Sequence, residues 1–169
     1  MITIDLVPRV KDYEISTSAL TRFLNRARAA VGLRGAVDVL LSGDSTLCTL
    51  NKSFRGKNKA TDVLSFPAPS AFATKHAGDL AISLETADRQ ASAFGHSVVA
   101  EIKILILHGL LHLAGEDHEI DDGQMAARES ILRQQLRLPA TLIERTGQKP
   151  VRGSKSPKSI KKKSARGGR

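Results

Sequence analysis

The segment His108–His118, HGLLHLAGEDH, holds three of the chain's five histidines and constrains the fold more than any other part of the sequence. His108 and His112 are four residues apart, which places them on one face of an α-helix, roughly 6 Å apart along its axis. His118 cannot reach that face if the helix continues. Gly115 can adopt positive φ, end the helix and turn the chain back, so the sequence predicts three imidazoles around one point.

Hydrophobic spacing predicts a set of helices and strands around this segment. The predicted strands cover residues 2–6, 37–41, 62–66 and 78–83, and the predicted helices cover residues 17–30, 44–54, 84–94, 97–113 and about 121–138. Strands interspersed with helices fit a single α+β domain with a mixed sheet of about four strands and about five helices. The helix 97–113 is apolar nearly all round, so we expect it to be the central, buried helix that carries the metal site together with its following loop.

The sequence also predicts the cap and the buried side of the helix 44–54. We expect Asp44 or Ser45 to cap the helix 44–54, and Leu47, Leu50 and Phe54 to form its buried side. The two remaining histidines, at positions 76 and 96, are interpreted as surface or loop residues.

The formal charge of +9 belongs to one end of the chain. Residues 147–169 contain nine of the 26 Lys and Arg residues and no acid, so basic and acidic residues are equal in number in the rest of the chain. This composition predicts a body at 1–146 and a disordered basic tail at 147–169. The tail would add affinity for nucleic-acid phosphates, act only as a solubilising segment, or contact an anionic membrane surface.

Cysteine usage and the hydropathy pattern indicate a cytoplasmic protein. Cys48 is the chain's single cysteine, which excludes an internal disulfide framework, and the polar start has no signal-like character. The most apolar run, residues 104–114, is shorter than the roughly 20 residues of a membrane span.

Three imidazoles with one open position are typical of a catalytic zinc site that holds one ion. An isolated histidine on an apolar helix is more often a hydrogen-bonded core residue, but three at this spacing favour metal binding. Asp117 is either a carboxylate that orients one of these imidazoles or an ordinary loop acid.

The segment resembles the zinc-protease motif H-E-x-x-H-x-x-G-x-x-H, except that Gly109 replaces the glutamate that serves as general base. This difference argues against a standard protease. Phosphodiester cleavage makes different demands: a metal ion can polarise a phosphoryl oxygen or bind hydroxide, while an arginine neutralises charge on the equatorial oxygens. Arg55, in the loop sequence FRGKNK with Lys57 and Lys59, is the candidate cation, although spacing alone favours an ordinary solvated arginine.

Three stretches together resemble the YbeY family of bacterial rRNA maturation factors and endoribonucleases. They are LNKSFRGKNKATDVLSFP at 50–67, GDLAIS at 78–83 and HGLLHLAGEDH at 108–118, and the match spans roughly residues 35–135. The resemblance implies that His108, His112 and His118 bind zinc and that Arg55 and His108 are the catalytic residues. It also implies cleavage of single-stranded RNA, 3′-end maturation of the 16S rRNA precursor and a part in ribosome quality control on ribosomal particles.

The chain departs from the family pattern at Glu116, where the family often has an aromatic residue, and in its basic tail. Two other functions stay open. One is a zincin-like peptidase with an unusual base such as Glu116, and the other is a ribosome-assembly factor whose metal is structural. Because aromatic residues make up only 4% of the chain, we expect RNA affinity to come mainly from charge.

Overall fold

The computed structural model describes residues 1–5 and 14–139. The elements in chain order are β1 Ile2–Ile4, α1 Thr17–Val31, β2 Ala36–Ser42, α2 Asp44–Arg55, β3 Val63–Pro67, β4 His76–Ser83, α3 Leu84–Phe94, α4 Val98–Leu113 and α5 Gln124–Leu136. The predicted α+β class, with four strands and five helices over the described ranges, is confirmed. The predicted boundary at residue 146 and the tail at 147–169 lie outside the described residues.

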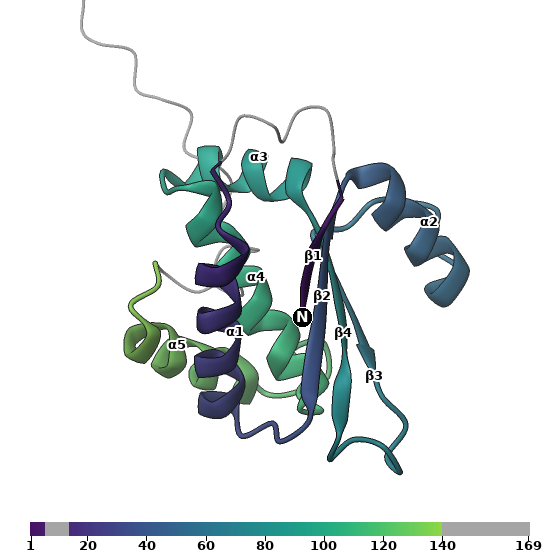
Figure 1. The fold of residues 1–169 in the computed structure, drawn as a ribbon, viewed down its shortest axis with the longest axis vertical. Helices are drawn as coiled ribbons and strands as arrows, with labels where there is room; N and C mark the ends of the chain where they lie inside the picture. The colour runs from purple at the N-terminus through teal and green to yellow at the C-terminus, as the bar shows by residue number, and fades with distance from the viewer. Residues whose placement is uncertain (6–13, 140–169) are drawn as a thin grey trace, which may run out of the picture.

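The four strands form one mixed sheet in the order β1-β2-β4-β3. The pairs β1·β2 and β2·β4 are parallel, and β3 pairs antiparallel with β4. Helices α1, α4 and α5 lie on one side of the sheet and α2 lies on the other (Figure 1). The strand order makes β3 an end strand of the described sheet, and its residues Val63 and Ser65 line the pocket described below.

Helix α4 is the central element of the core, as its all-round apolar sequence predicts. Twelve of its sixteen residues are buried, because the sheet covers one side and α1, α3 and α5 pack around the rest. The Ser97 side chain caps the helix by accepting a hydrogen bond from the Ala100 backbone N–H at 3.1 Å. Among the described helices none is long and apolar enough by itself to cross a membrane, and α3 with α4 meets that criterion only as a pair bent by 111°.

Helix α2 differs from the prediction at both ends. Gly43 is its N-cap, without a side-chain bond, and Asp44 is the first helical residue. Leu47 is fully buried, but Phe54 is 68% exposed and meets the ring of Phe66 edge-on at 5.0 Å. The buried side predicted for Phe54 is therefore wrong, because α2 diverges from the sheet toward its C-terminal end (Figure 1).

Asp44 joins the starts of α2 and α3. Its carboxylate accepts hydrogen bonds from the Ser83 hydroxyl, from the Thr86 hydroxyl at 2.7 Å and from Arg89 at 2.9 Å. The Asp44 backbone N–H in turn donates to the Glu85 carboxylate at 2.7 Å. Burial raises the pKa of Asp44, but the three hydrogen bonds and the Arg89 charge outweigh it and hold the pKa below its ordinary value of 3.8.

Replacement of this carboxylate tests its contribution. We expect Asp44→Asn to lower the free energy of unfolding at pH 7 by about 1–3 kcal/mol, since charge-assisted bonds at the α2–α3 junction are lost. A pKa lowered in the folded state stabilises above the unfolded value, so the difference between the two proteins should shrink as the pH falls below 3.8. Urea unfolding at several pH values measures this, and a difference that is constant down to pH 2 would contradict it.

Candidate metal centre

Three histidine side chains converge at the C-terminal end of α4. One ligand atom from each of His108, His112 and His118 lies within 4.8 Å of the other two. His108 Nε2 and His112 Nε2 are 3.2 Å apart, and the ring centre of His118 is 5.2 and 5.3 Å from the rings of His108 and His112. The convergence predicted from the offsets of four and six residues is present.

The turn at Gly115 brings His118 back to the helix. Ala114 caps α4, and Gly115 follows with φ of 89°. The Glu116 N–H bonds the Leu111 carbonyl at 3.1 Å, and the Gly115 N–H bonds the His112 carbonyl at 3.0 Å. This is the Schellman arrangement, which satisfies the last carbonyls of the helix while reversing the chain.

A buried carboxylate orients His108. Nδ1 of His108 donates to Glu129 Oε2 at 2.9 Å, and Arg133 Nη1 donates to Oε1 of the same carboxylate at 3.1 Å. The side chains of Glu129 and Arg133 are 0% and 2% exposed. With its proton on Nδ1, the neutral imidazole of His108 presents the lone pair of Nε2 toward the other two histidines.

Glu129 was not predicted as part of the site, although the sequence contains a signal for it. It stands on the buried face of α5 between Met125 and Leu132, where an apolar residue is expected. A carboxylate in that position needs a partner, and Arg133 follows one helical turn later. Asp117, the carboxylate considered from the sequence, accepts a hydrogen bond from the Glu119 backbone N–H at 3.0 Å.

The surroundings of His112 favour its neutral form. Burial lowers the pKa of His112, and the adjacent His108 and His118 lower it further. The Asp117 carboxylate and a hydrogen bond with the backbone of Glu116 raise it by less. The net pKa lies below the ordinary value of 6.5, so at pH 7 the imidazole is available as a metal ligand.

These residues fit a divalent metal ion with imidazole ligands. Two nitrogens bound tetrahedrally at about 2.0–2.1 Å from zinc lie about 3.3 Å apart, close to the 3.2 Å between His108 Nε2 and His112 Nε2. In the described part of the chain, His118 Nδ1 is buried without a hydrogen-bond partner. The three-histidine group can therefore hold one metal ion.

Gly109 explains why the glutamate of the protease motif is absent. A Cβ atom at this position would lie 2.7 Å from Leu80 Cδ2 and 3.3 Å from Ser65 Oγ. The Ser65 hydroxyl also donates to the Gly109 carbonyl at 3.3 Å. Position 109 faces the sheet across a close helix–strand contact, so a side chain there would require Leu80 to move.

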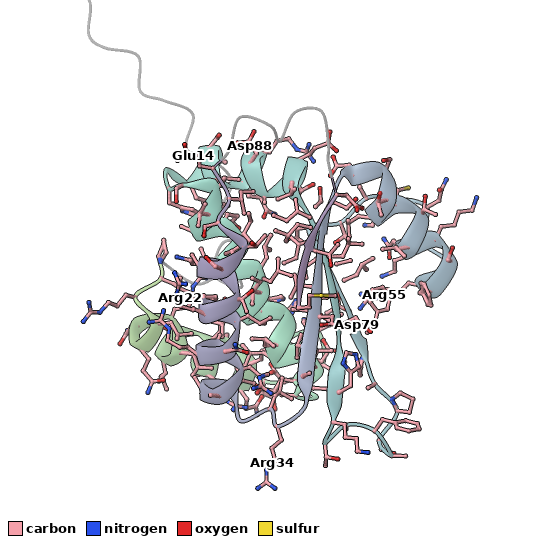
Figure 2. The ribbon with its side chains drawn as sticks, in the orientation of Figure 1. Glu14, Arg22, Arg34, Arg55, Asp79 and Asp88 are labelled. Atoms are coloured by element: carbon pink, nitrogen blue, oxygen red, sulfur yellow. The ribbon has the colours of Figure 1, made fainter. Side chains whose placement is uncertain are left out.

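Arg55 and the histidines share one pocket of about 570 Å³, a size typical of ligand sites. The other lining residues come from the α2–β3 loop, β3, α3 and the loop after α4: Lys57, Thr61, Asp62, Val63, Ser65, Gln90, Phe94, Asp117 and Glu119. Figure 2 shows Arg55 at the free end of α2. The structure thus places the arginine selected from the sequence beside the histidine group, where Lys57 adds positive charge.

Glu116, considered above as a substitute base, pairs with Arg128. Arg128 also donates to the Val31 carbonyl at 2.7 Å, which ties this loop to α1. Glu116 is not one of the residues that line the pocket. Its carboxylate therefore stabilises the loop after α4.

A second group of possible metal ligands lies on the sheet, on the same side as α2 (Figure 2). It consists of Asp38 on β2 with His76 and Asp79 on β4. The side chains are 36–55% exposed, His76 pairs with Asp79 at 3.1 Å, and the Met1 amino group pairs with Asp38 at 2.5 Å. Unlike the histidine group, it is exposed and its charges already have partners.

Fold and site together define an α+β protein whose central helix and following loop carry a three-histidine group that can bind a metal ion in an open pocket. A model of the family described as Endoribonuclease YbeY matches residues 8–137. The chain belongs to the YbeY family, as the three sequence stretches predict.

Relatives and a solved structure agree with this assignment. The chain is 51% identical over 144 residues to Endoribonuclease YbeY of Koribacter versatilis, covering 85% of this chain and 93% of the relative. It is 50% identical over 127 residues to the protein of the same name from Solibacter usitatus, covering 75% and 84%. The solution structure of a Thermotoga maritima protein is similar with a TM-score of 0.52 and 26% identity, covering 80% of this chain and 89% of that one.

The close contact at Gly109 can be tested by restoring the protease glutamate. We expect Gly109→Glu to lower the free energy of unfolding by at least about 1–3 kcal/mol, because the side chain collides with Leu80 and brings a charge into the core. Ile131→Glu, at a 62% exposed position of α5, is the matched control and should change stability little. A stable Gly109→Glu protein would show that the helix can move away from the sheet.

The role of Glu129 is tested by metal affinity. We expect Glu129→Gln to weaken zinc binding by about 10- to 100-fold, since the hydrogen bond that orients His108 loses its charge. Competition with a chelating dye measures the dissociation constant, and thermal unfolding of the metal-free protein reports the separate effect on Arg133. Unchanged affinity in a folded variant would remove Glu129 from the site.

Proposed function

We propose that the chain is a zinc-dependent endoribonuclease that acts on single-stranded RNA. The observation that carries the proposal is one pocket that holds both the three-histidine group and Arg55. Membership of a family described as Endoribonuclease YbeY supports RNA as the substrate. Such residues suit phosphodiester cleavage, in which a metal ion can polarise the phosphate and a nearby cation can neutralise its developing charge.

Each residue has a separate role in this proposal. His108, His112 and His118 would hold the ion, and zinc bound there would supply Lewis-acid chemistry toward the phosphate. Glu129 fixes the orientation of His108. Arg55 neutralises negative charge that builds up on the phosphate oxygens during cleavage. We therefore assign Arg55 as a catalytic residue, together with His108, which is also a metal ligand.

The biological substrate is proposed on the family resemblance. We infer that the protein acts in the cytoplasm on ribosomal particles, in 3′-end maturation of the 16S rRNA precursor and in ribosome quality control. The basic tail at 147–169 would add salt-dependent affinity for RNA phosphates. The tail itself lies outside the described residues.

Two alternatives make different predictions. A ribosome-assembly factor with a structural metal would bind ribosomal particles without cleaving RNA. A peptidase would cleave peptides without RNA, but the pairing of Glu116 with Arg128 weighs against the base that this alternative needs.

The first test is cleavage of a single-stranded RNA by protein with measured zinc content. We expect His112→Ala, purified in the same way, to lose both zinc and cleavage, because two imidazoles hold the ion much less tightly than three. Zinc added after chelation should restore cleavage only in the wild type. Equal cleavage by both proteins would indicate a contaminating nuclease, and retained zinc in His112→Ala would refute the ligand assignment.

The second test separates Arg55 from metal binding. We expect Arg55→Glu to keep its zinc content but to lower kcat for RNA cleavage by about 10²–10³-fold, the effect of removing one group that stabilises the transition state. Arg22→Glu makes the same charge change on α1, across the sheet from Arg55 (Figure 2), and should keep its activity. Equal losses in both variants would mean that net charge alone accounts for the effect.

A further inference from the structure

Helix α3 supplies one wall of the pocket through two residues that the proposed cleavage chemistry does not use. Gln90 and Phe94 are one helical turn apart, and both line the pocket that holds Arg55 and the histidine group. Phe94 is the aromatic residue among the lining residues and is 41% exposed. An exposed aromatic ring beside charged and polar groups is typical of a surface that binds a flat ligand.

Neighbouring residues fix the Phe94 ring. It stacks on the imidazole of His96 with 11° between the ring planes and 6.5 Å between the ring centres. His96 lies in the loop after α3, as expected from the sequence, but its side chain is only 11% exposed. It pairs with the fully buried carboxylate of Glu101 in the first turn of α4. The pocket wall is thus anchored to the core, which reduces the entropy lost when a ligand stacks on it.

The Gln90 amide is also fixed in position. Its Nε2 donates to Asp62 Oδ2 at 3.0 Å, and Asp62 Oδ1 accepts from the Val63 backbone N–H at 2.8 Å. Because the carboxylate accepts only, the Gln90 nitrogen points toward Asp62 and the orientation of the amide is determined. In the described residues, Gln90 Oε1 is buried and has no hydrogen-bond donor. A buried acceptor of this kind is unfavourable unless a donor from a ligand satisfies it.

The two sides of the pocket therefore offer different chemistry. Arg55 and Lys57 supply positive charge for a phosphate, while α3 supplies an aromatic ring and a hydrogen-bond acceptor. A nucleotide has this same division, with a charged phosphate at one end and, at the other, a flat base whose edge carries N–H donors. Aromatic rings stack on bases of any sequence, and a base must be unpaired and splayed out to be reached.

We propose that Phe94 and Gln90 form a nucleobase subsite, in which Phe94 stacks on a base next to the cleaved phosphate and Gln90 Oε1 accepts a hydrogen bond from the edge of that base. The subsite rests on the proposed ribonuclease function and deepens it. It explains a requirement for single-stranded RNA, since both faces of a base in a duplex are covered by its neighbours. It also adds one stacking group to a chain whose RNA affinity was expected to come mainly from charge.

The test uses a short single-stranded RNA whose cleavage position has been mapped with the zinc-loaded wild type. We expect Phe94→Ala to raise KM by about 5- to 150-fold, the loss that corresponds to one stacked base. Phe94→Tyr should retain most of the affinity because its ring also stacks. Phe72→Ala removes a ring that is 62% exposed but does not line the pocket, so this control should keep the wild-type KM.

A double-mutant cycle identifies the base that Phe94 contacts. An abasic nucleotide placed at each position beside the cleaved bond should raise KM for the wild type at one position and have little further effect on Phe94→Ala at that position. The fluorescence of 2-aminopurine at the same position should be quenched by the wild type but not by Phe94→Ala. Gln90→Leu should reduce the preference among the four bases there.

The outcomes separate the subsite from the proposed function. If the wild type cleaves RNA but Phe94→Ala has the same KM, the subsite is refuted and the ribonuclease function stands. Full additivity of the abasic and Phe94→Ala effects, or an equal loss in Phe72→Ala, also refutes it. If zinc-loaded wild type neither binds nor cleaves RNA, both proposals fail. Should Phe94→Ala not fold, Phe94→Leu, which keeps an apolar side chain but removes the ring, takes its place in the KM measurement and in the abasic cycle, with the same two outcomes.

Discussion

The close packing of α4 on the sheet at Gly109 is the contact on which the rest of the site depends. Because position 109 has no side chain, the helix can approach Leu80 and Ser65 directly, and the neighbouring His108 lines a pocket together with Val63 and Ser65 of β3. The same contact is consistent with glycine, rather than the protease glutamate, at position 109. The position that carries the base in zinc proteases is occupied here by a packing contact, and the pocket draws its charged groups from other elements.

A buried ionic chain connects this helix to the following one. His108, Glu129 and Arg133 run from the metal-binding face of α4 into α5 through two hydrogen bonds. Removing these charged groups from water is costly, and well-packed apolar residues often stabilise a core as well or better. Their presence is explained by the site, since a fixed carboxylate sets the tautomer of His108. The desolvation cost of the buried Glu129 and Arg133 charges is therefore linked to the orientation of one imidazole, that of His108.

Sequence reasoning succeeded where the determining interactions are local. The helices follow from apolar residues at helical spacing, and the three-histidine group follows from offsets of four and six residues with Gly115 between. It failed where a residue's environment depends on how elements diverge or meet. Phe54 has helical spacing with Leu47 and Leu50 but is exposed, because α2 diverges from the sheet and Phe54 meets it there through an edge-on contact with Phe66. The local pattern of α5 marks Glu129 as a buried acid but does not show that it meets His108. Gln90 and Phe94 come from a helix whose approach to the pocket no local pattern encodes.

The junction at Asp44 affects the distance between Arg55 and Phe94 in the pocket. Arg55 is the last residue of α2 and Phe94 is the last residue of α3, and both helices start at the cluster formed by Asp44 and Ser83. The hydrogen bonds at this junction therefore set the directions in which both helices leave the sheet. Since α2 is about 18 Å long, a tilt of about 5° at its start moves Arg55 by about 1.5 Å. A substitution at Asp44, which does not line the pocket, would therefore alter the gap between the groups that we assign to phosphate and base.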